Sequence, residues 1–374
     1  MRNTKSKIFL NFFLLLFAIV FSALLIEILL RIFYPQNLNI TTLDSERVFK
    51  HKEGIDSVLR RNEFSTNVKI SSQGLRDREY SVEKIQGTKR VAVVGDSFVF
   101  GFGVEQNETF AKLLEEKLNK VHGNYEVMNF GTSAYSSEQE YLYMKNEIIK
   151  FNPDLTILAF SLNDIKENVK FNIFDFKNNT LMQNPEQKIT FSLKLRNFIS
   201  WNSHLYSLMY FSVIENEKLR ILLIQLHLLN PPYKNPDTDF DSLIYQNNNN
   251  PDFKYSVNKT IALLAAMNNL AKKNNITFTI FINPTKEQVD NKKNEEYIHD
   301  RNLDKARLNM TQVQQILKEN IGNKGIMTID PLDIFRKQNI NNTFYYDIDG
   351  HWNKKGHNLV ADILYGKLAT YKLI

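Results

Sequence analysis

Two distant blocks of this sequence carry the residue types needed to form or break an ester. Residues 91–98 read Val-Ala-Val-Val-Gly-Asp-Ser-Phe, so Ser97 follows directly after an apolar run. A serine hydroxyl becomes an effective nucleophile only when a neighbouring base removes its proton. Near the other end of the chain, residues 347–353 read Asp-Ile-Asp-Gly-His-Trp-Asn and offer His351 as that base. The pair predicts nucleophilic acyl chemistry.

The acid that would orient His351 has two candidates. Asp349 lies two residues before the histidine and Asp347 lies four residues before it. The orienting carboxylate accepts a hydrogen bond from the ring nitrogen that does not face the serine. We expect Asp349 to fill this role, with Asp347 as its rival.

A third block offers a hydrogen-bond donor for the transition state. Residues 161–164 read Ser-Leu-Asn-Asp and again follow an apolar run. The tetrahedral intermediate of acyl transfer needs donors for its oxyanion, and the Asn163 amide is suited to that task. The alternative interpretation of Asn163 is a turn residue after a strand.

Together these blocks resemble the SGNH, or GDSL-type, hydrolase family. The matching segments, in the family's order, are Gly95-Asp96-Ser97-Phe98, residues 129–136, Asn163-Asp164 and Asp349-Gly350-His351. The resemblance runs from about residue 89 to the C-terminus and leaves one long internal stretch unexplained. It implies an acyl-serine mechanism in which Ser97, Asp349 and His351 are catalytic.

The resemblance also implies an oxyanion hole made by three donors. These are the Ser97 backbone N–H, the backbone N–H of Ala134, which stands where the family has glycine, and the Asn163 side chain. The chain departs from the family again at Ser161, the usual glycine of the third block. Secondary site candidates are Asp96, Gly131, Asp164 and Asp347.

The motif Asp-x-His-Trp at residues 349–352 refines the expected function. It resembles SGNH-like proteins that acetylate bacterial exopolysaccharides, which implies an O-acylated, most simply O-acetylated, glycan as substrate. Both hydrolysis and transfer use the same acyl-enzyme, so the sequence leaves esterase and acyltransferase open. A lipid or small-ester hydrolase, or a non-catalytic glycan-binding protein, is the alternative.

Strands and helices alternate around these blocks. Apolar and β-branched runs predict strands at residues 90–97, 125–130, 155–161, 277–282 and 326–329. Helical spacing predicts helices at residues 109–121, 138–151, 255–273, 303–320 and 357–371. Such alternation predicts a parallel sheet with helices on both faces, and ligands bind at the carboxyl edge of such sheets. The resemblance implies the specific form, an SGNH, flavodoxin-like three-layer α/β/α fold.

Residues 165–254 interrupt this alternation with an aromatic-rich stretch. Because about ninety residues are too many for a plain loop, we expect an inserted helical subdomain. A lid over the site, a second packing layer and a membrane-contacting patch are its open interpretations. The expected organisation is a transmembrane anchor at 1–34, an extracytoplasmic linker or pre-domain at 35–89 and an SGNH-like domain at 90–374.

The N-terminus predicts a membrane anchor. Residues 8–30 are almost wholly apolar, and about 20 such residues suffice to cross a bilayer. Glu27 lies near the end of this span, four residues before Arg31, and we expect the two to pair. Arg2, Lys5 and Lys7 precede the span, so the positive-inside rule places the N-terminus in the cytoplasm and the remainder outside, in the periplasm or at the cell surface.

Composition excludes several other classes. The chain of 374 residues has no cysteine, so disulfides, thiolate nucleophiles and cysteine-ligated zinc are excluded. The net charge of +6 is spread along the chain without a basic motif, which argues against nucleic-acid binding. No spacing of ligands suggests a metal, and we expect no cofactor. Expected partners are the acylated substrate, the membrane at residues 8–30 and, for a transferase, a membrane protein that supplies acyl groups.

Overall fold

The computed structural model describes residues 2–186, 188–215, 218, 222–223, 243–246, 250–301, 303–339 and 343–374. The chain divides into two compact units. Unit 1 comprises Met1–Thr41 and Ile189–Lys234, and unit 2 comprises Thr42–Lys188 and Asn235–Ile374. Residues 219–229, which form a strongly apolar part of the inserted stretch, lie almost entirely outside the described residues.

Unit 2 is built on a five-stranded sheet whose order is β11-β10-β7-β5-β6. Its strands are β5 (Lys89–Gly95), β6 (Tyr125–Gly131), β7 (Leu155–Phe160), β10 (Thr277–Ile282) and β11 (Met327–Ile329). All neighbouring pairs are parallel, and β5 pairs with both β6 and β7. The chain therefore enters the sheet at β5, adds β6 on one side as an edge strand, and then adds β7, β10 and β11 on the other side. This order confirms the predicted flavodoxin-like fold and puts the ligand-binding switch point at β5 and β7.

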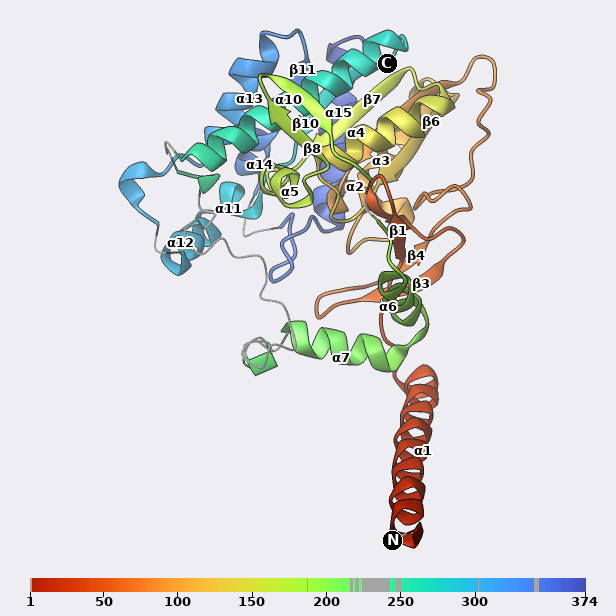
Figure 1. The fold of residues 1–374 in the computed structure, drawn as a ribbon. Coiled ribbons are helices and arrows are strands. Elements are labelled where there is room, and N and C mark those ends of the chain that lie inside the picture. Colours follow the sequence, from red (N-terminus) through yellow and green to blue (C-terminus); the bar gives the residue numbers. More distant parts are fainter. Residues whose placement is uncertain are drawn as a thin grey trace. The chain divides into compact units, whose positions relative to one another are not determined.

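Helices cover both faces of the sheet (Figure 1). On β5, Val91 and Val93 face one hydrophobic cluster, whereas Ala92 and Val94 face another. The first cluster is shared with α3 (Phe110–Val121), α14 (Leu332–Gln338) and α15 (Lys354–Thr370). The second is shared with α4 (Ser137–Asn146), α10 (Pro251–Lys273) and α13 (Gln312–Gly322). Because successive strand residues point to opposite faces, a strand buried on both sides reads as a continuous apolar run.

Shorter elements complete unit 2. They are α5 (Asp164–Phe171), α11 (Lys286–Val289), α12 (Asn291–Asp300) and the 3₁₀ helices at Gln106–Glu108, Ile148–Phe151 and Lys305–Arg307. Three two-stranded sheets are formed by β1 (Thr41–Asp44) with β2 (Val48–His51), β3 (Asp56–Arg60) with β4 (Ser65–Lys69), and β8 (Phe174–Lys177) with β9 (Thr180–Gln183).

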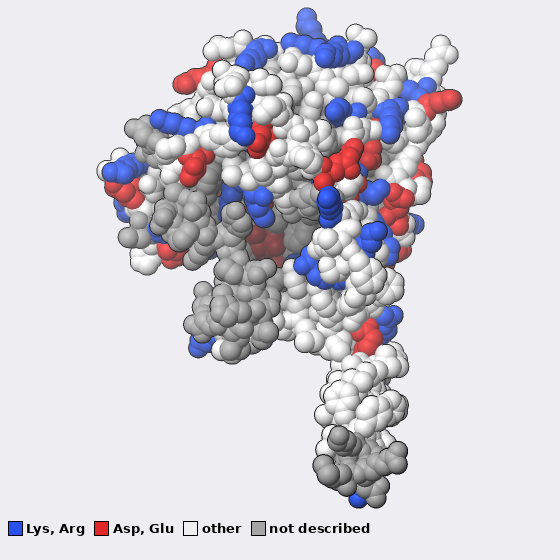
Figure 2. Space-filling view, in the orientation of Figure 1, with Lys and Arg blue, Asp and Glu red and all other residues white. Residues whose placement is uncertain are grey.

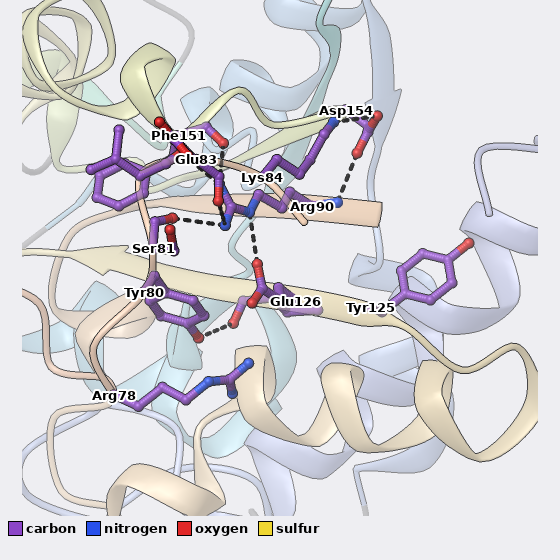
Figure 3. A network of polar contacts seen from close by, with 12 residues as sticks. Arg78, Tyr80, Ser81, Glu83, Lys84, Arg90, Tyr125, Glu126, Phe151 and Asp154 are labelled. Carbon is purple, nitrogen blue, oxygen red and sulfur yellow. Dashed lines mark hydrogen bonds and ion pairs between the residues drawn. The ribbon is translucent and has the colours of Figure 1, made fainter. Parts of the chain in front are cut away.

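A buried arginine joins the segment before the sheet to the amino ends of the strands (Figure 3). The Arg90 guanidinium donates to Glu126 Oε2 over 2.7 Å and to the carbonyls of Ser81 and Phe151 over 2.7 and 2.8 Å. Asp154 accepts from the Arg90 backbone N–H and also pairs with Lys84. This network lies at the end of β5 opposite Ser97, so it fixes the strand without touching the expected site.

Unit 1 contains α1 (Arg2–Phe33), α6 (Phe191–Asn202) and α7 (His204–Glu215). Residues Lys7–Phe33 of α1 are long and apolar enough to cross a membrane. Figure 2 shows most of the length of α1 without charged side chains. Glu27 and Arg31 form the expected ion pair, with 2.8 Å between Oε1 and Nε.

Candidate active site

The carboxyl end of β5 delivers Ser97 to the edge of the sheet. The strand ends at Gly95, and Ser97 is the first residue of the short helix α2 (Ser97–Phe100). Asp96 caps this helix by accepting a hydrogen bond from the Phe98 N–H over 2.9 Å. The Ser97 side chain is only partly buried, so its hydroxyl remains accessible.

Two glycines allow α2 to pack closely on the sheet. A Cβ at Gly131 would lie 2.1 Å from the Phe100 backbone nitrogen, and a Cβ at Gly95 would lie 2.5 Å from Val99 Cγ2. Gly131, a secondary candidate from the sequence, therefore brings the nucleophile turn against the end of β6. Its observed contacts belong to packing.

A second buried arginine holds the other end of α2. The Arg76 guanidinium donates to the carbonyls of Phe100, Gly101 and Val104 over 3.0, 2.6 and 2.7 Å. Carbonyls at a helix C-terminus have no partners within the helix, and Arg76 supplies them. Burial lowers the pKa of Arg76 to about 10. Sequence reasoning missed this residue because its partners are backbone atoms, which leave no motif.

The loop before α15 brings His351 to Ser97. His351 Nε2 lies 2.7 Å from Ser97 Oγ, and its Nδ1 makes a short contact with Asp349 Oδ1. Gly350, between the acid and the base, has a φ of +83°, a left-handed conformation that glycine adopts without strain. This turn folds the imidazole back onto Asp349. Acid, base and hydroxyl therefore form one continuous chain of contacts.

Aromatic rings surround the imidazole. The ring centroids of Phe98 and Phe102 lie 5.0 and 4.8 Å from that of His351. Trp352 is fully buried and packs edge-on against Phe98 at 4.6 Å. These contacts limit rotation of the imidazole and keep Nε2 directed at the serine.

The two candidate acids have different surroundings. Asp347 has its side chain 77% exposed, with Oδ1 3.7 Å from Lys286 Nζ. Asp349 contacts His351, and the carboxylate of Glu63 accepts from its backbone N–H over 2.7 Å. Glu63 also accepts from the N–H groups of Asp347 and Ile348. Glu63 lies between β3 and β4, nearly three hundred residues earlier in sequence, so spacing could not reveal it.

The protonation of Asp349 suits an orienting role. Burial raises the pKa of Asp349, but the hydrogen bond with His351 and the positive charge of a protonated His351 outweigh burial. The resulting pKa lies below the ordinary value for aspartate. At neutral pH Asp349 is therefore an anion that can accept a hydrogen bond from the Nδ1–H group of His351.

The three expected oxyanion donors belong to three different segments. Ala134 has a φ of +65°, the left-handed region that normally favours glycine. It thus retains the backbone conformation expected of the glycine that it replaces. Asn163 is exposed at the start of α5, and its side chain hydrogen-bonds to the Asp96 carboxylate. Because an amide carries two N–H donors, that bond leaves one for an oxyanion.

Replacing Asn163 with alanine should lower kcat by about 10²–10³-fold, the usual effect of losing one oxyanion donor. The Michaelis constant should change much less, because the oxyanion forms only after the substrate binds. Steady-state kinetics on an activated ester would separate the two. An effect confined to the Michaelis constant would identify Asn163 as a binding residue instead.

Three buried carboxyl groups lie beneath the site. Asp96, Glu140 and Asp164 are each at most 2% exposed. Asp164 Oδ2 accepts from Ser137 Oγ over 2.7 Å. Both carboxyl oxygens of Glu140 are buried without a hydrogen-bond partner among the described residues. Burial and then the neighbouring negative charges raise the pKa of both Glu140 and Asp164 well above the ordinary value.

The raised pKa of Glu140 predicts how stability depends on pH. A carboxyl group whose pKa is raised by folding stabilises the fold below its unfolded pKa, about 4.3 for glutamate. That contribution is lost as the pH rises toward the pKa of the group in the folded protein. For one proton, the free energy of unfolding falls by at most about 1.4 kcal/mol per pH unit. The free energy of unfolding of the native chain should therefore fall from pH 5 to pH 8 by more than that of the Glu140→Gln variant. The variant thus gains stability relative to the native chain as the pH rises across this range. Urea unfolding of the detergent-solubilised protein at both pH values would measure this.

The matched control is Glu295→Gln, which changes an exposed glutamate on α12. Its stability difference from the native chain should be the same at both pH values. An equally constant difference for Glu140→Gln would show that folding does not raise the pKa of Glu140.

The remaining candidates have structural surroundings. Asp164 lies inside the protein, where it accepts a hydrogen bond from Ser137 and neighbours Glu140. The hydrogen-bond partner of His351 Nε2 is Ser97. His357 is buried in α15, where its Nδ1 accepts from the Phe110 N–H over 3.2 Å, and burial lowers its pKa to about 3. Among the described residues no cluster of three or more His, Asp or Glu side chains could hold a metal ion.

The C-terminal third of the chain matches a known family. Residues 244–372 match the family described as the SGNH hydrolase-like domain of acetyltransferase AlgX. No curated protein matches the chain. The family match includes Asp349 and His351, whereas the block around Ser97 lies before it.

Several solved structures are similar to this chain. The acetyl xylan esterase AlAXEase has 13% identity, covers 75% of this chain and 99% of its own, and gives a TM-score of 0.42. A putative lipolytic protein of the G-D-S-L family from Desulfitobacterium hafniense has 11% identity, covers 75% and 99%, and gives 0.41. A catalytic mutant of the acetylxylan esterase Axe2 from Geobacillus stearothermophilus has 12% identity, covers 76% and 96%, and gives 0.41. Residues 244–372 are therefore similar to an SGNH hydrolase-like domain, and this region contains the block with Asp349 and His351.

Proposed function

We propose that this chain is a membrane-anchored serine esterase or O-acyltransferase that acts on O-acylated glycans outside the cytoplasm. The observation that carries the catalytic part is the set of contacts from Ser97 Oγ to His351 Nε2 and from His351 Nδ1 to Asp349. A hydroxyl, a base and an orienting carboxylate in this sequence are the parts of a nucleophilic triad.

The first half-reaction acylates the serine. Ser97 Oγ attacks the ester carbonyl while His351 Nε2 takes the hydroxyl proton, and the oxyanion receives hydrogen bonds from the Ser97 and Ala134 backbone N–H groups and from Asn163. The carbon–oxygen bond to the leaving alcohol then breaks, and His351 returns its proton to that alcohol. Asp349 stabilises the imidazolium between these events.

The second half-reaction removes the acyl group. A water molecule or a sugar hydroxyl gives its proton to His351 and attacks the acyl-serine carbonyl. Collapse of the intermediate releases the acid or the new ester, and His351 reprotonates Ser97. Hydrolysis and transfer differ only in the nucleophile that enters at this step, so both are compatible with the same residues.

The family match supports an acetyl group and a glycan as the substrate class. The matching family is described by an acetyltransferase, AlgX, and its region of similarity contains the Asp-x-His-Trp block at residues 349–352. The same block carries the sequence resemblance to proteins that acetylate exopolysaccharides. We therefore assign O-acetylated, exported polysaccharides as the first substrates to try.

Product analysis with the full-length protein in detergent tests this proposal. The substrates are acetylated oligosaccharides, with a medium-chain lipid ester for comparison and Ser97→Ala as the control. Free acetate indicates hydrolysis, whereas acetyl groups on an added unacetylated oligosaccharide indicate transfer. Exclusive cleavage of the lipid ester would reject the glycan, and the absence of any turnover above Ser97→Ala would reject the enzyme.

Topology supplies a separate prediction. Arg2, Lys5 and Lys7 precede the span, and beyond it only Arg31 appears before Arg47. The positive-inside rule therefore favours a cytoplasmic N-terminus and an extracytoplasmic unit 2. An enzyme in that place has no access to cytoplasmic acyl-CoA, so a transferase would need a membrane partner that supplies acyl groups.

Reporters fused after Ile374 would measure this orientation. A reporter that works only outside the cytoplasm should be active, and one that works only inside should be silent. The full-length chain should also remain with the membrane fraction. An active cytoplasmic reporter would overturn both the orientation and the exported substrate.

A further inference from the structure

The helix α6 carries its apolar stripe on the outside. Phe191, Leu195 and Phe198 are 80%, 48% and 58% exposed, and they recur at the helical spacing of four and three residues. The opposite side of α6 is the partly buried one, where Asn197 and Ser200 face Asn39 within unit 1. A helix of a water-soluble protein has the reverse arrangement, with the apolar stripe covered.

The helix α7 also exposes apolar and aromatic side chains. Met209 and Tyr210 are 61% and 50% exposed. Neither α6 nor α7 contains an acidic residue before Glu215, whereas α6 has Lys194 and Arg196 exposed beside its stripe. Apolar and aromatic side chains flanked by cations suit the surface of a membrane that contains anionic lipids.

Glu27 of α1 fixes the place where α7 begins. Its carboxylate accepts from the backbone N–H groups of His204 and Leu205 over 3.0 and 2.9 Å, and from Ser203 Oγ over 2.9 Å. The first N–H groups of a helix have no partners within it, so Glu27 acts as the cap of α7. The contact also explains an acidic residue in an apolar span, since its charge is paired with Arg31 and hydrogen-bonded.

The position of Glu27 sets the depth of α7. Glu27 lies six residues before Phe33, the last residue of the candidate span, which corresponds to about 9 Å along a helix. Interfacial helices bury their apolar side about 5–10 Å into the boundary between headgroups and acyl chains. Figure 1 shows α7 running across the end of α1, so a bilayer crossed by α1 would hold α7 along its surface.

We propose that α6 and α7 form an interfacial element that lies in the outer surface of the bilayer beside α1 and binds anionic phospholipid. Each helix has 12 residues, which is too short to cross a bilayer but sufficient to lie along it. Phe33 and Tyr34, 76% and 64% exposed at the end of α1, belong to the same aromatic level. Unit 1 would then contact the membrane through three helices, namely the anchor α1 and the interfacial helices α6 and α7.

Fluorescence quenching on the full chain tests this proposal, and the absence of native cysteines makes single labels straightforward. Single cysteines replace Phe198, Met209, Phe17 in the span and Lys324, which is exposed in unit 2. Each bimane-labelled protein is reconstituted in vesicles of phosphatidylcholine and phosphatidylglycerol. The quenchers are nitroxides at shallow and deep positions of the lipid, and iodide in the water.

The labels at Phe198 and Met209 should lose more fluorescence to shallow than to deep nitroxides. The label at Phe17 should show the opposite order, and the label at Lys324 should respond only to iodide. If Phe198 and Met209 behave like Lys324, the two helices lie in water and the proposal fails. If neither quencher reaches them, protein covers this surface and the proposal also fails.

The label at Phe17 separates this proposal from the membrane anchor on which it rests. Loss of lipid quenching at Phe17 would reject the anchor itself. With the anchor intact, the variant Glu27→Ala should reduce lipid quenching at Met209 and leave that at Phe17 unchanged. Unchanged quenching at Met209 in this variant would show that Glu27 does not hold α7 at the surface.

Discussion

Replacing Ser97 or His351 with alanine should abolish ester cleavage and leave the fold intact. The two side chains lie 2.7 Å apart and are both only partly buried, so truncation removes the nucleophile or its base without opening the core. In the serine protease subtilisin, loss of the nucleophile or the base lowers kcat by about 10⁶-fold, and we expect a loss of that order here. Steady-state rates, together with circular dichroism of each variant, would measure both parts of this expectation.

The double variant gives the sharper test. Members of a triad act as one unit, so removing both should cost little more than removing either. Losses that multiply would indicate that Ser97 and His351 serve separate functions, despite the contact between them. His357→Ala is a suitable comparison, because this buried histidine bonds the start of α3 and should affect stability instead of chemistry.

The second large effect is expected at Asp349. Its replacement by asparagine should lower kcat by about 10⁴-fold, as in the corresponding serine-protease variant, because an amide can hold the wrong imidazole tautomer. Asp347→Asn should have little effect, since that side chain is 77% exposed and faces Lys286. Parallel kinetics of the two variants would measure the ranking.

The pair Asp349 and Asp347 is a matched control within one loop. The two residues are separated by Ile348 alone, and Glu63 accepts from the backbone N–H of each. Substitution by asparagine leaves those backbone bonds in place, so a difference between the variants reports the side chains. A larger loss at Asp347 would move the acid to that position.

The sequence predicts the sheet well because its strands are buried on both faces. Such strands give unbroken apolar runs, as in residues 91–94 and 157–160, and Ser97 and Asn163 follow shortly after the ends of these two runs. Parallel strands of a doubly wound sheet end at one edge, so two residues far apart in the chain meet there. The parallel sheet with helices on both faces therefore follows from the alternation of strands and helices, whereas the SGNH, flavodoxin-like form followed from the resemblance.

Local hydrogen bonds changed elements that periodicity predicted as helix. The helix expected at residues 303–320 begins only at Gln312. Before it, Asn309 Oδ1 accepts from the backbone N–H of Thr311 over 3.2 Å, which gives the chain an alternative to helical bonding. Asparagine side chains that bond to the backbone in this way compete with helical hydrogen bonds. The helix therefore starts later than the spacing of apolar residues predicts.

The inserted stretch shows a similar effect. Within it, β8 and β9 form a hairpin whose turn residues, Asn178 and Asn179, have φ values of +51° and +59°. Two consecutive left-handed residues give the twist that a tight hairpin needs, and asparagine tolerates this conformation. The helices α6 and α7 also lie in this stretch, where its length led us to expect a helical subdomain, and the hairpin adds two strands to them.

Contacts made through the backbone could not be predicted. Arg76 holds the carbonyls at the end of α2, and Glu63 holds the N–H groups of the loop that carries Asp349. Every residue has backbone atoms, so a bond to the backbone requires no particular residue type at that position. Such contacts therefore leave no motif in the sequence. The proposed catalytic residues could be named from the sequence, whereas the residues that hold their segments in place required the structure.

Labelling with a serine-reactive fluorophosphonate tests the catalytic role of Ser97 most directly. The purified full-length chain should be labelled at a single residue, Ser97, as mass spectrometry of its peptides would show. His351→Ala should label far more slowly, and Ser97→Ala should not label at that peptide. Equal labelling of the native chain and Ser97→Ala would contradict the proposed mechanism, because Ser97 would then not be the activated nucleophile.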